Sequence, residues 1–457
     1  MSEQIEMKLG KPGAKKFLSI DGGGIRGVLP LQILKEIENI VIKYNPSCEC
    51  LGDYFDFIGG TSTGSIIATG LAIGMKVDEI LEVYTKHGNE IFHKIELTEA
   101  KLQEYLKPSI DGALKALSPP LSLFAKPLRG WVEKSIPKWI RNYLKSKNMD
   151  DSLLLQLIYG WQYDHTLLEK QLKEKFGDLT LGSEKLKTLL MIVTKNATTG
   201  QPYFFVNNPR DPEFKDIYSK IMLRDIVRAS SAAPTYFSPH SFKVGNDEFE
   251  FIDGGMSSFN NPSFMLFLQA VTNQFGINWS SGEDNLLMIS VGTGFSQQSL
   301  KWDEKTQDYM KAKDYKLTDW GEYAIGTLME DANIQENLIM KLIGQKVGKK
   351  TTSRKYATST TYIDNWDFPE VTKDGEEKWL KYRRYSCSLT KERFNQLKER
   401  FGLELTFDLD NREKIERINH MDCTDMIEDL CAIGAAVAKE QVRESHFEGF
   451  TENPINP

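Results

Sequence analysis

The sequence predicts an α/β protein with three layers, in which helices cover both faces of a mainly parallel central sheet. The first observation behind this is a short apolar run, residues 17–20, which stops at three glycines and precedes a helical pattern over residues 28–44. The second is a repeat of that arrangement, with an apolar run at residues 55–58, glycines, and an apolar stretch over residues 65–74. Successive strand–glycine–helix units are typical of a parallel sheet that is buried on both faces.

The two helices are predicted by the spacing of their apolar residues. In residues 28–44, leucine, isoleucine and valine recur every three or four positions, which places them on one helix face. Pro30 falls in the first turn, where its missing N–H removes no helical hydrogen bond. Residues 65–74 are apolar nearly throughout, which is typical of a buried helix.

Four further apolar runs predict strands, because each is short and ends near glycine, asparagine or a polar turn. They are residues 189–194, 203–207, 249–252 and 286–291. Between the second and third strands, residues 83–182 have a helical pattern. This stretch predicts a helical insertion into the sheet domain.

The chain contains no internal repeat and no low-complexity linker, so its domain boundaries are only weakly marked. We expect a short tail over residues 1–14 and one α/β domain over residues 15–300 that includes the insertion. Beyond residue 300 the sequence turns polar and helical, with a charged pattern at residues 391–400 and an alanine-rich helix at residues 426–442. Residues 301–457 are therefore predicted to form a helical C-terminal extension.

The composition argues against some classes of protein. A formal net charge of −7 argues against a nucleic acid polymer as partner, because polyanions are held mainly by an excess of lysine and arginine. Residues 1–16 lack the apolar core of a secretion signal, and no run approaches the ~18 apolar residues that span a bilayer. We expect a cytoplasmic protein that associates with membranes peripherally when active.

The five cysteines do not form a metal-binding pattern. No pair has C-x-x-C spacing, and no histidine lies near the closest pair. The cysteines are Cys48, Cys50, Cys387, Cys423 and Cys431. We expect reduced thiols and no metal site.

The pentapeptide from Gly60 to Gly64, with Ser62 at its centre, follows the second predicted strand and precedes a helix. A nucleophilic serine on such a sharp turn needs glycine two residues away on each side, because larger side chains would collide there. The N–H groups at the start of the next helix point toward developing negative charge. The motif and its context predict that Ser62 is a nucleophile.

The glycine-rich loop after the first strand, residues 21–27, predicts a site for an oxyanion. Gly22, Gly23 and Gly24 allow backbone N–H groups to approach a charged oxygen without obstruction from side chains. Arg26 is expected to support this loop or to bind a phosphate of the substrate, since a guanidinium matches phosphate oxygens.

The same loop also fits a nucleotide-binding motif, since Gly22, Gly24 and Gly27 form G-x-G-x-x-G after a strand. A dinucleotide-binding fold requires an acidic residue at the end of the next strand to hold the ribose. That strand leads instead into the turn that carries Ser62. We therefore favour the oxyanion hole and keep a nucleotide-binding module as an alternative.

Asp253 is the predicted general base. It ends the apolar run at residues 249–252 and precedes two glycines, so its carboxylate can point into a site. A turn-capping aspartate is the structural alternative. A Ser62–Asp253–His420 triad is the catalytic alternative, but His420 lies in a polar helical region. In a dry site, a direct hydrogen bond lets an aspartate take the serine proton.

The three motifs together resemble the signatures of the patatin-like phospholipase family, D-G-G-G-x-R-G, G-x-S-x-G and D-G-[GA]. They match residues 21–27, 60–64 and 253–255. Residues 229–237 also resemble the family's segment between nucleophile and acid. The resemblance is firm over residues 15–300 and looser afterwards, although residues 382–442 are similar to the tail of bacterial members.

This resemblance implies a patatin-like three-layer α/β/α fold, a Ser62–Asp253 dyad, an oxyanion hole from Gly22 to Gly24, and neither metal nor cofactor. It also implies a phospholipase A-type enzyme that cleaves ester-linked fatty acids from membrane phospholipids. Many bacterial members look like immune or toxin effectors that a partner or a small molecule, such as a nucleotide second messenger, switches on. An activator-gated effector with the same dyad is therefore an alternative to a constitutive lipase.

Residues 115–147 are basic and aromatic, with eight lysines and arginines, one acidic residue and interleaved aromatic residues that include Trp131 and Trp139. One interpretation is a solvated helix face with a few core aromatic residues. The other is a lid or interfacial surface, because basic residues attract anionic headgroups while tryptophan settles at the bilayer boundary.

Overall fold

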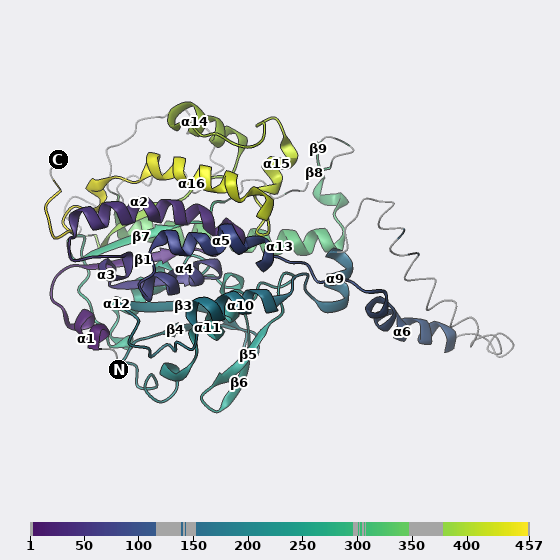
Figure 1. Ribbon diagram of the computed structural model, residues 1–457, viewed down its shortest axis with the longest axis horizontal. Helices are drawn as coiled ribbons and strands as arrows, with labels where there is room; N and C mark the ends of the chain where they lie inside the picture. The colour runs from purple at the N-terminus through teal and green to yellow at the C-terminus, as the bar shows by residue number, and fades with distance from the viewer. Residues whose placement is uncertain are drawn as a thin grey trace.

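The fold is the predicted three-layer α/β/α arrangement, seen in a computed structural model (Figure 1). The structure describes residues 3–115, 139, 142, 152–295, 300, 302–303, 306, 308–346 and 378–455. Within these residues, no helix is both long and apolar enough to cross a membrane. The five cysteines are free thiols.

The central sheet has the strand order β10-β11-β7-β1-β2-β3-β6-β5, and β4 pairs with β3. The strands from β10 to β3 are parallel, whereas β4, β6 and β5 join by antiparallel pairing. Their bounds are β1 Lys15–Ile20, β2 Phe57–Thr61, β3 Leu189–Asn196, β4 Gln201–Val206, β5 His240–Val244, β6 Asp247–Asp253, β7 Leu286–Val291, β10 Gly344–Lys346 and β11 Leu380–Tyr385. A separate two-stranded sheet pairs β8 (Trp302–Asp303) with β9 (Asp308–Tyr309).

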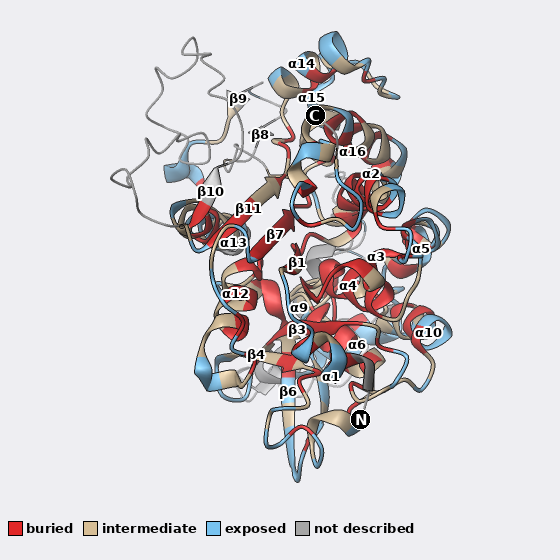
Figure 2. Cartoon of the chain, turned by 90° about the vertical axis from the view of Figure 1, so that its left-hand side faces the viewer, coloured by how far each residue is buried: buried red, intermediate tan, exposed pale blue. Residues whose placement is uncertain are grey.

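Helices α2, α4 and α11 cover one face of the sheet, with α5, α10 and α16 packed outside them, and α12 and α13 cover the other face (Figure 2). The helix bounds are α1 Glu3–Gly10, α2 Val28–Tyr44, α3 Leu51–Tyr54, α4 Thr63–Ala72, α5 Val77–Ile91, α6 Glu99–Lys115, α9 Ser152–Tyr159, α10 His165–Phe176, α11 Leu223–Ser230, α12 Ser263–Val271, α13 Leu317–Ile343, α14 Lys391–Phe401, α15 Arg412–Arg417 and α16 Ile427–Gln441. The strands β1, β2, β3 and β7 are buried nearly throughout, as expected for a sheet covered on both faces.

Strand β2 begins and ends later than the predicted residues 55–58. We expected its two glycines to end the strand, but Gly59 and Gly60 lie inside it. A Cβ at Gly59 would collide with Leu266 of α12, and a Cβ at Gly60 would collide with the Gly64 carbonyl. The glycines therefore mark close packing of helices on the strand rather than its end.

The C-terminal part of the chain is not only helical, which corrects our expectation for residues 301–457. Strands β10 and β11 join the edge of the central sheet, and β11 pairs in parallel with β7. The sequence of β11 is LKYRRY, and its charged residues interrupt the apolar pattern by which a strand is predicted. Part of this extension thus completes the sheet that carries the candidate site.

The predicted insertion at residues 83–182 contains α6, α9, α10 and most of α5. The basic aromatic stretch at residues 115–147 lies outside the described residues, apart from the backbone of Lys115 and the isolated positions Trp139 and Asn142. The Trp139 side chain is 64% exposed.

Candidate active site

Ser62 occupies a strained turn between β2 and α4. Its backbone has φ 54° and ψ −124°, which is unusual for a residue with a Cβ, and α4 begins at the next residue. A Cβ on Gly64 would collide with the carbonyl of Ile20, so glycine is required for this close approach. The geometry is that of a nucleophile elbow, with the serine at the N-terminus of a helix.

The register of three neighbouring strands brings Asp253 beside Ser62. Thr61, the last residue of β2, pairs with Val193 of β3, and the next residue of β3, Thr194, pairs with Asp253. The Asp253 carboxylate hydrogen-bonds with the Ser62 side chain and accepts a second hydrogen bond, 2.7 Å long, from the Gly255 N–H. The two predicted dyad residues therefore lie side by side, although they are 191 positions apart in the sequence.

Burial of Asp253 sets its ionisation. The residue is only 4% exposed, and desolvation raises the pKa of its carboxyl group to about 7. The hydrogen bonds from Ser62 and Gly255 oppose this rise. The carboxylate is a stronger base than an aspartate in water, and it interacts with the Ser62 hydroxyl.

Ser230 holds the turn in place from the end of α11. Its hydroxyl accepts a hydrogen bond from the Ser62 N–H at 2.9 Å and donates one to the Val193 carbonyl at 2.6 Å. A single hydroxyl thus ties the nucleophile turn to β3. Ser230 lies in the stretch of residues 229–237 that we matched to the family by sequence, but the sequence did not indicate this contact.

The glycine loop lies directly against the nucleophile, because a Cβ on Gly22 would approach the Ser62 Cβ at 3.0 Å. The Gly22 N–H donates to the Asn260 carbonyl at 3.3 Å, so this N–H is already engaged. Among the described residues, the N–H groups of Gly23 and Gly24 have no acceptor. These two groups are the better candidates for an oxyanion hole, and Gly22 contributes the space that its missing side chain leaves.

Arg26 forms a hydrogen bond within the glycine loop. Its Nε donates to the Gly23 carbonyl at 3.4 Å, and burial lowers the pKa of the guanidinium. His420, the alternative triad member, is exposed in a bend after α15, and neither partner of the Asp253 carboxylate is a histidine. Within the described part of the chain, no group of histidine, cysteine and acidic side chains is placed to hold a metal ion.

Arg384 is a site residue that sequence reasoning missed. From β11 it forms a two-pronged ion pair with Asp21, the residue before the glycine loop, with Nη1 at 2.7 Å from Oδ1 and Nη2 in contact with Oδ2. The same Nη1 donates to the Ser290 hydroxyl at 2.8 Å. Asp21 is 2% exposed. The C-terminal segment therefore anchors the loop that faces Ser62. No local sequence motif around Arg384 predicts this contact.

Replacing Arg384 by glutamine is expected to destabilise the protein by about 3 kcal/mol, because it removes the ion pair that Arg384 makes with the buried Asp21 carboxylate. We also expect kcat to fall at least about tenfold with a smaller change in KM, since the loop loses its anchor. Thermal unfolding and steady-state kinetics measure both effects. The double variant D21N/R384Q removes both charges and is expected to recover most of the stability. An R384Q variant as stable and active as the wild type would contradict this role.

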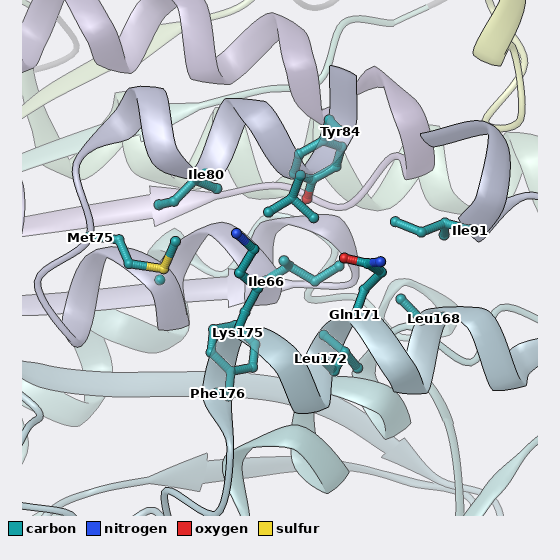
Figure 3. A pocket seen from close by; sticks show the side chains of 12 residues that line it. Ile66, Met75, Ile80, Tyr84, Ile91, Leu168, Gln171, Leu172, Lys175 and Phe176 are labelled. Atoms are coloured by element: carbon teal, nitrogen blue, oxygen red, sulfur yellow. The ribbon is translucent and has the colours of Figure 1, made fainter. Parts of the chain in front are cut away.

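An apolar cavity lies beside the nucleophile turn, between α4, α5 and α10 (Figure 3). Its lining is almost entirely aliphatic or aromatic, and it includes Ile66, one helical turn beyond Ser62. Tyr84 lines the cavity and also donates a hydrogen bond to the Thr63 carbonyl at 3.1 Å. The cavity is therefore connected through Tyr84 to the residue that follows the nucleophile.

Comparison with known proteins agrees with these features. The family model described as "Patatin-like phospholipase" matches residues 18–266, which is more than half of the chain. The matched range contains the glycine loop, the Ser62 turn and Asp253.

Three curated relatives illustrate the similarity. The chain is 32% identical over 288 residues to a protein of Vibrio cholerae named "cGAMP-activated phospholipase", covering 62% of this chain and 66% of that protein. It is 30% identical over 287 residues to a protein of Escherichia coli with the same name, covering 62% and 64%. Patatin-01 of Solanum tuberosum is 25% identical over 357 residues, covering 70% and 74%. The chain thus spans just under two thirds of the two bacterial relatives.

Proposed function

The chain belongs to the patatin-like phospholipase family, and from this premise we propose that it is a lipid acyl hydrolase in which Ser62 and Asp253 form the catalytic dyad. The observation that carries the proposal is the hydrogen bond between Ser62, on its strained turn, and a buried aspartate whose pKa is raised to about 7. A serine hydroxyl in contact with a base of near-neutral pKa is the arrangement that nucleophilic acyl transfer requires.

In the proposed reaction, the Ser62 Oγ attacks the ester carbonyl carbon while the Asp253 carboxylate takes the hydroxyl proton. The carbonyl electrons move to oxygen, and the N–H groups of Gly23 and Gly24 stabilise the resulting oxyanion. When the intermediate collapses, the alcohol leaves with the proton from Asp253. Water then attacks the acyl-serine as Asp253 takes its proton. Release of the fatty acid returns that proton to Ser62.

The cavity beside α4 supports an apolar acyl group as part of the substrate. Its lining offers almost no polar atoms, so burial of a hydrocarbon chain there is favourable, whereas burial of a hydroxylated chain is not. The cavity is small, about 20 Å³, so its walls must move apart to admit an acyl chain. These features favour fatty-acid esters, such as membrane phospholipids, over esters of small polar acids.

A second proposal concerns control of the activity. The two bacterial relatives carry a name that describes activation by cGAMP. We propose that this chain also responds to a small-molecule activator of the nucleotide class. The ion pair between Arg384 and Asp21 gives a physical route for such control, because a change at β11 would reach the glycine loop directly.

Contact with membranes is proposed to be peripheral and to involve the basic aromatic stretch at residues 115–147. Replacing Trp131 and Trp139 together by alanine is expected to weaken binding to anionic phospholipid vesicles about tenfold, because each buried indole adds apolar area at the interface. Vesicle sedimentation measures the binding. The W320A variant is the control, since Trp320 is 43% exposed but lies on α13, outside this stretch. Unchanged binding of the double variant would refute the proposal.

Fatty-acid release from mixed phospholipid vesicles, with and without a cyclic dinucleotide, tests the proposed function. We expect release by the wild type that is strongly increased by the dinucleotide and absent in S62A. Release that the dinucleotide does not change would support a constitutive lipase. No release under either condition, together with no hydrolysis of long-chain model esters, would contradict the hydrolase proposal.

A further inference from the structure

Strand β11 presents different charges to the two faces of the sheet. Side chains alternate along a strand, so Arg384 points toward α12 and α13, where it meets Asp21 and Ser290. The alternate residues Lys381, Arg383 and Tyr385 therefore lie on the opposite face. The C-terminal chain after α16 covers that face, because the Tyr385 hydroxyl is 2.7 Å from Nδ1 of His446 and Lys381 donates to the Glu448 carbonyl at 2.9 Å.

Arg383 is the exceptional residue of this strand. Its Nε and Nη2 atoms are buried, and neither has a hydrogen-bond partner among the residues that the structure describes. A buried N–H group without an acceptor costs free energy, and the cost is larger when the group carries a charge. The residue as a whole is only partly buried, and residues 443–450 cover its face of the strand, so a ligand reaches the Nε and Nη2 atoms only if these covering residues shift.

The charges around Arg383 are mainly positive. Lys381 and Arg443 lie near it, and burial together with the positive charges of Arg383, Arg443 and Lys381 lowers the pKa of the neighbouring His446 to about 3. Burial also lowers the pKa of Arg383 to about 10, and among the described residues only the Tyr385 phenol opposes this shift. The nearby carboxylates of Glu283, Asp284 and Glu448 act on Lys381 instead. Within the described part of the chain, Arg383 thus has positive charge near it but no carboxylate of its own.

We propose that Arg383 is the centre of a binding site for a phosphate-type anion on the face of β11 that is covered by residues 443–450. A phosphate offers paired oxygens that match the Nε and Nη2 donors, and its negative charge compensates the surrounding cations. The site is separate from the dyad and goes beyond the proposed function. The phosphate belongs to a soluble nucleotide or to a lipid headgroup, since both present the same oxygens.

The proposed anion site is connected to the active site through strand β11. Arg383 and Arg384 are consecutive residues of one strand, and Arg384 holds the loop that faces Ser62. An anion bound at Arg383 therefore contacts the side chain next to the one that holds Asp21. Binding itself requires no hydrolysis, so the site is tested independently of the dyad.

Binding of inorganic phosphate to the full chain tests the site. We expect phosphate to raise the Tm of the wild type in a saturable manner, by about 3 °C at saturation, because a ligand that binds only the folded state stabilises it. R383Q is expected to lose at least tenfold in affinity, and R383K to bind weakly because a lysine keeps the charge without the fork. The control is R400Q, which removes the same charge from a side chain that is 67% exposed on α14. It is expected to bind like the wild type.

Circular dichroism in phosphate-free buffer establishes that each variant is folded before binding is measured. Equal stabilisation of wild type and R383Q by phosphate, or no stabilisation of the wild type, would overturn the proposal.

Two further experiments identify the source of the phosphate. Arg383-dependent binding of a soluble cyclic dinucleotide at lower concentration than phosphate would assign the site to a nucleotide. Arg383-dependent sedimentation with phosphatidic acid vesicles would assign it to a lipid headgroup. S62A is expected to bind phosphate normally, so failure of the hydrolase proposal would leave this result intact.

Discussion

Replacing Ser62 by alanine is expected to lower kcat for ester hydrolysis at least about 10⁴-fold, because the variant lacks the atom that forms the acyl intermediate. The fold is expected to persist. Ser62 is only partly buried, its turn is held through backbone contacts to Ser230 and Ser65, and alanine preserves the Cβ that the turn already accommodates. Hydrolysis of phospholipid vesicles and thermal unfolding measure these two properties.

The S241A variant provides a matched control, since Ser241 is exposed on β5 and belongs neither to the dyad nor to the glycine loop. We expect this variant to retain wild-type activity. Loss of activity in S62A together with a large fall in Tm would show only misfolding. An S62A variant that stays folded and retains more than a few per cent of activity would contradict the assignment of the nucleophile.

Replacing Asp253 by asparagine is expected to reduce kcat about 10³-fold, because the amide cannot accept the Ser62 proton. In the wild type, Asp253 must be ionised to act as a base. We therefore expect kcat/KM to rise with pH and to level off above about pH 7, the pKa to which burial raises this carboxyl group. A pH–rate profile of the wild type measures the midpoint. A midpoint near pH 4 would mean that this carboxyl group is not the base.

The same raised pKa predicts an effect on stability. Between its ordinary pKa of 3.8 and about 7, the folded protein holds the Asp253 proton while the unfolded chain has lost it. The unfolded state therefore binds fewer protons, and the contribution of this group to stability falls as pH rises through that window. The difference of about 3 pK units corresponds to about 4 kcal/mol as an upper bound. Above pH 7, D253N is expected to be more stable than the wild type.

Comparison of variants isolates this contribution, because burial also raises the pKa of Glu38 and raises that of Glu336 to about 8. The D247N variant is the control, since Asp247 is exposed at the start of the same strand. It is expected to keep the pH dependence of the wild type. Equal pH dependence of stability in D253N and the wild type would contradict the raised pKa.

The parts of the fold that the sequence predicted are those with a strong apolar pattern. Helix α2 and strand β7 have the bounds that we expected. Apolar residues recur at helical spacing along α2, and β7 is a short, nearly continuous apolar run. Strand β5 was not predicted, since its hairpin with β6 carries many exposed residues. Strand β11 was missed because Lys381, Arg383 and Arg384 interrupt its pattern. Lys381 and Arg384 donate hydrogen bonds to groups that are distant in the sequence.

The site residues that the sequence predicted are likewise those that lie in local motifs. Ser62 and the glycine loop are local motifs whose chemistry depends on residues two or three positions apart, so the sequence indicated them. The pairing of Asp253 with Ser62 was inferred from motifs, and the sheet register provides its physical cause. The roles of Ser230 and Arg384 depend on hydrogen bonds across 168 and 363 positions, and no local pattern encodes such contacts. Gly22 and Asn260 are also far apart in the sequence, which explains why the hydrogen bond from the Gly22 N–H to Asn260 was not predicted.

Labelling with a fluorophosphonate probe, followed by mass spectrometry of the modified peptide, tests the central claim most directly, because the probe reports an activated serine without requiring the natural substrate. We predict a single adduct on Ser62 in the wild type, none in S62A, and labelling at least about 100-fold slower in D253N. An adduct on another serine, or labelling of D253N at the wild-type rate, would contradict the Ser62–Asp253 dyad.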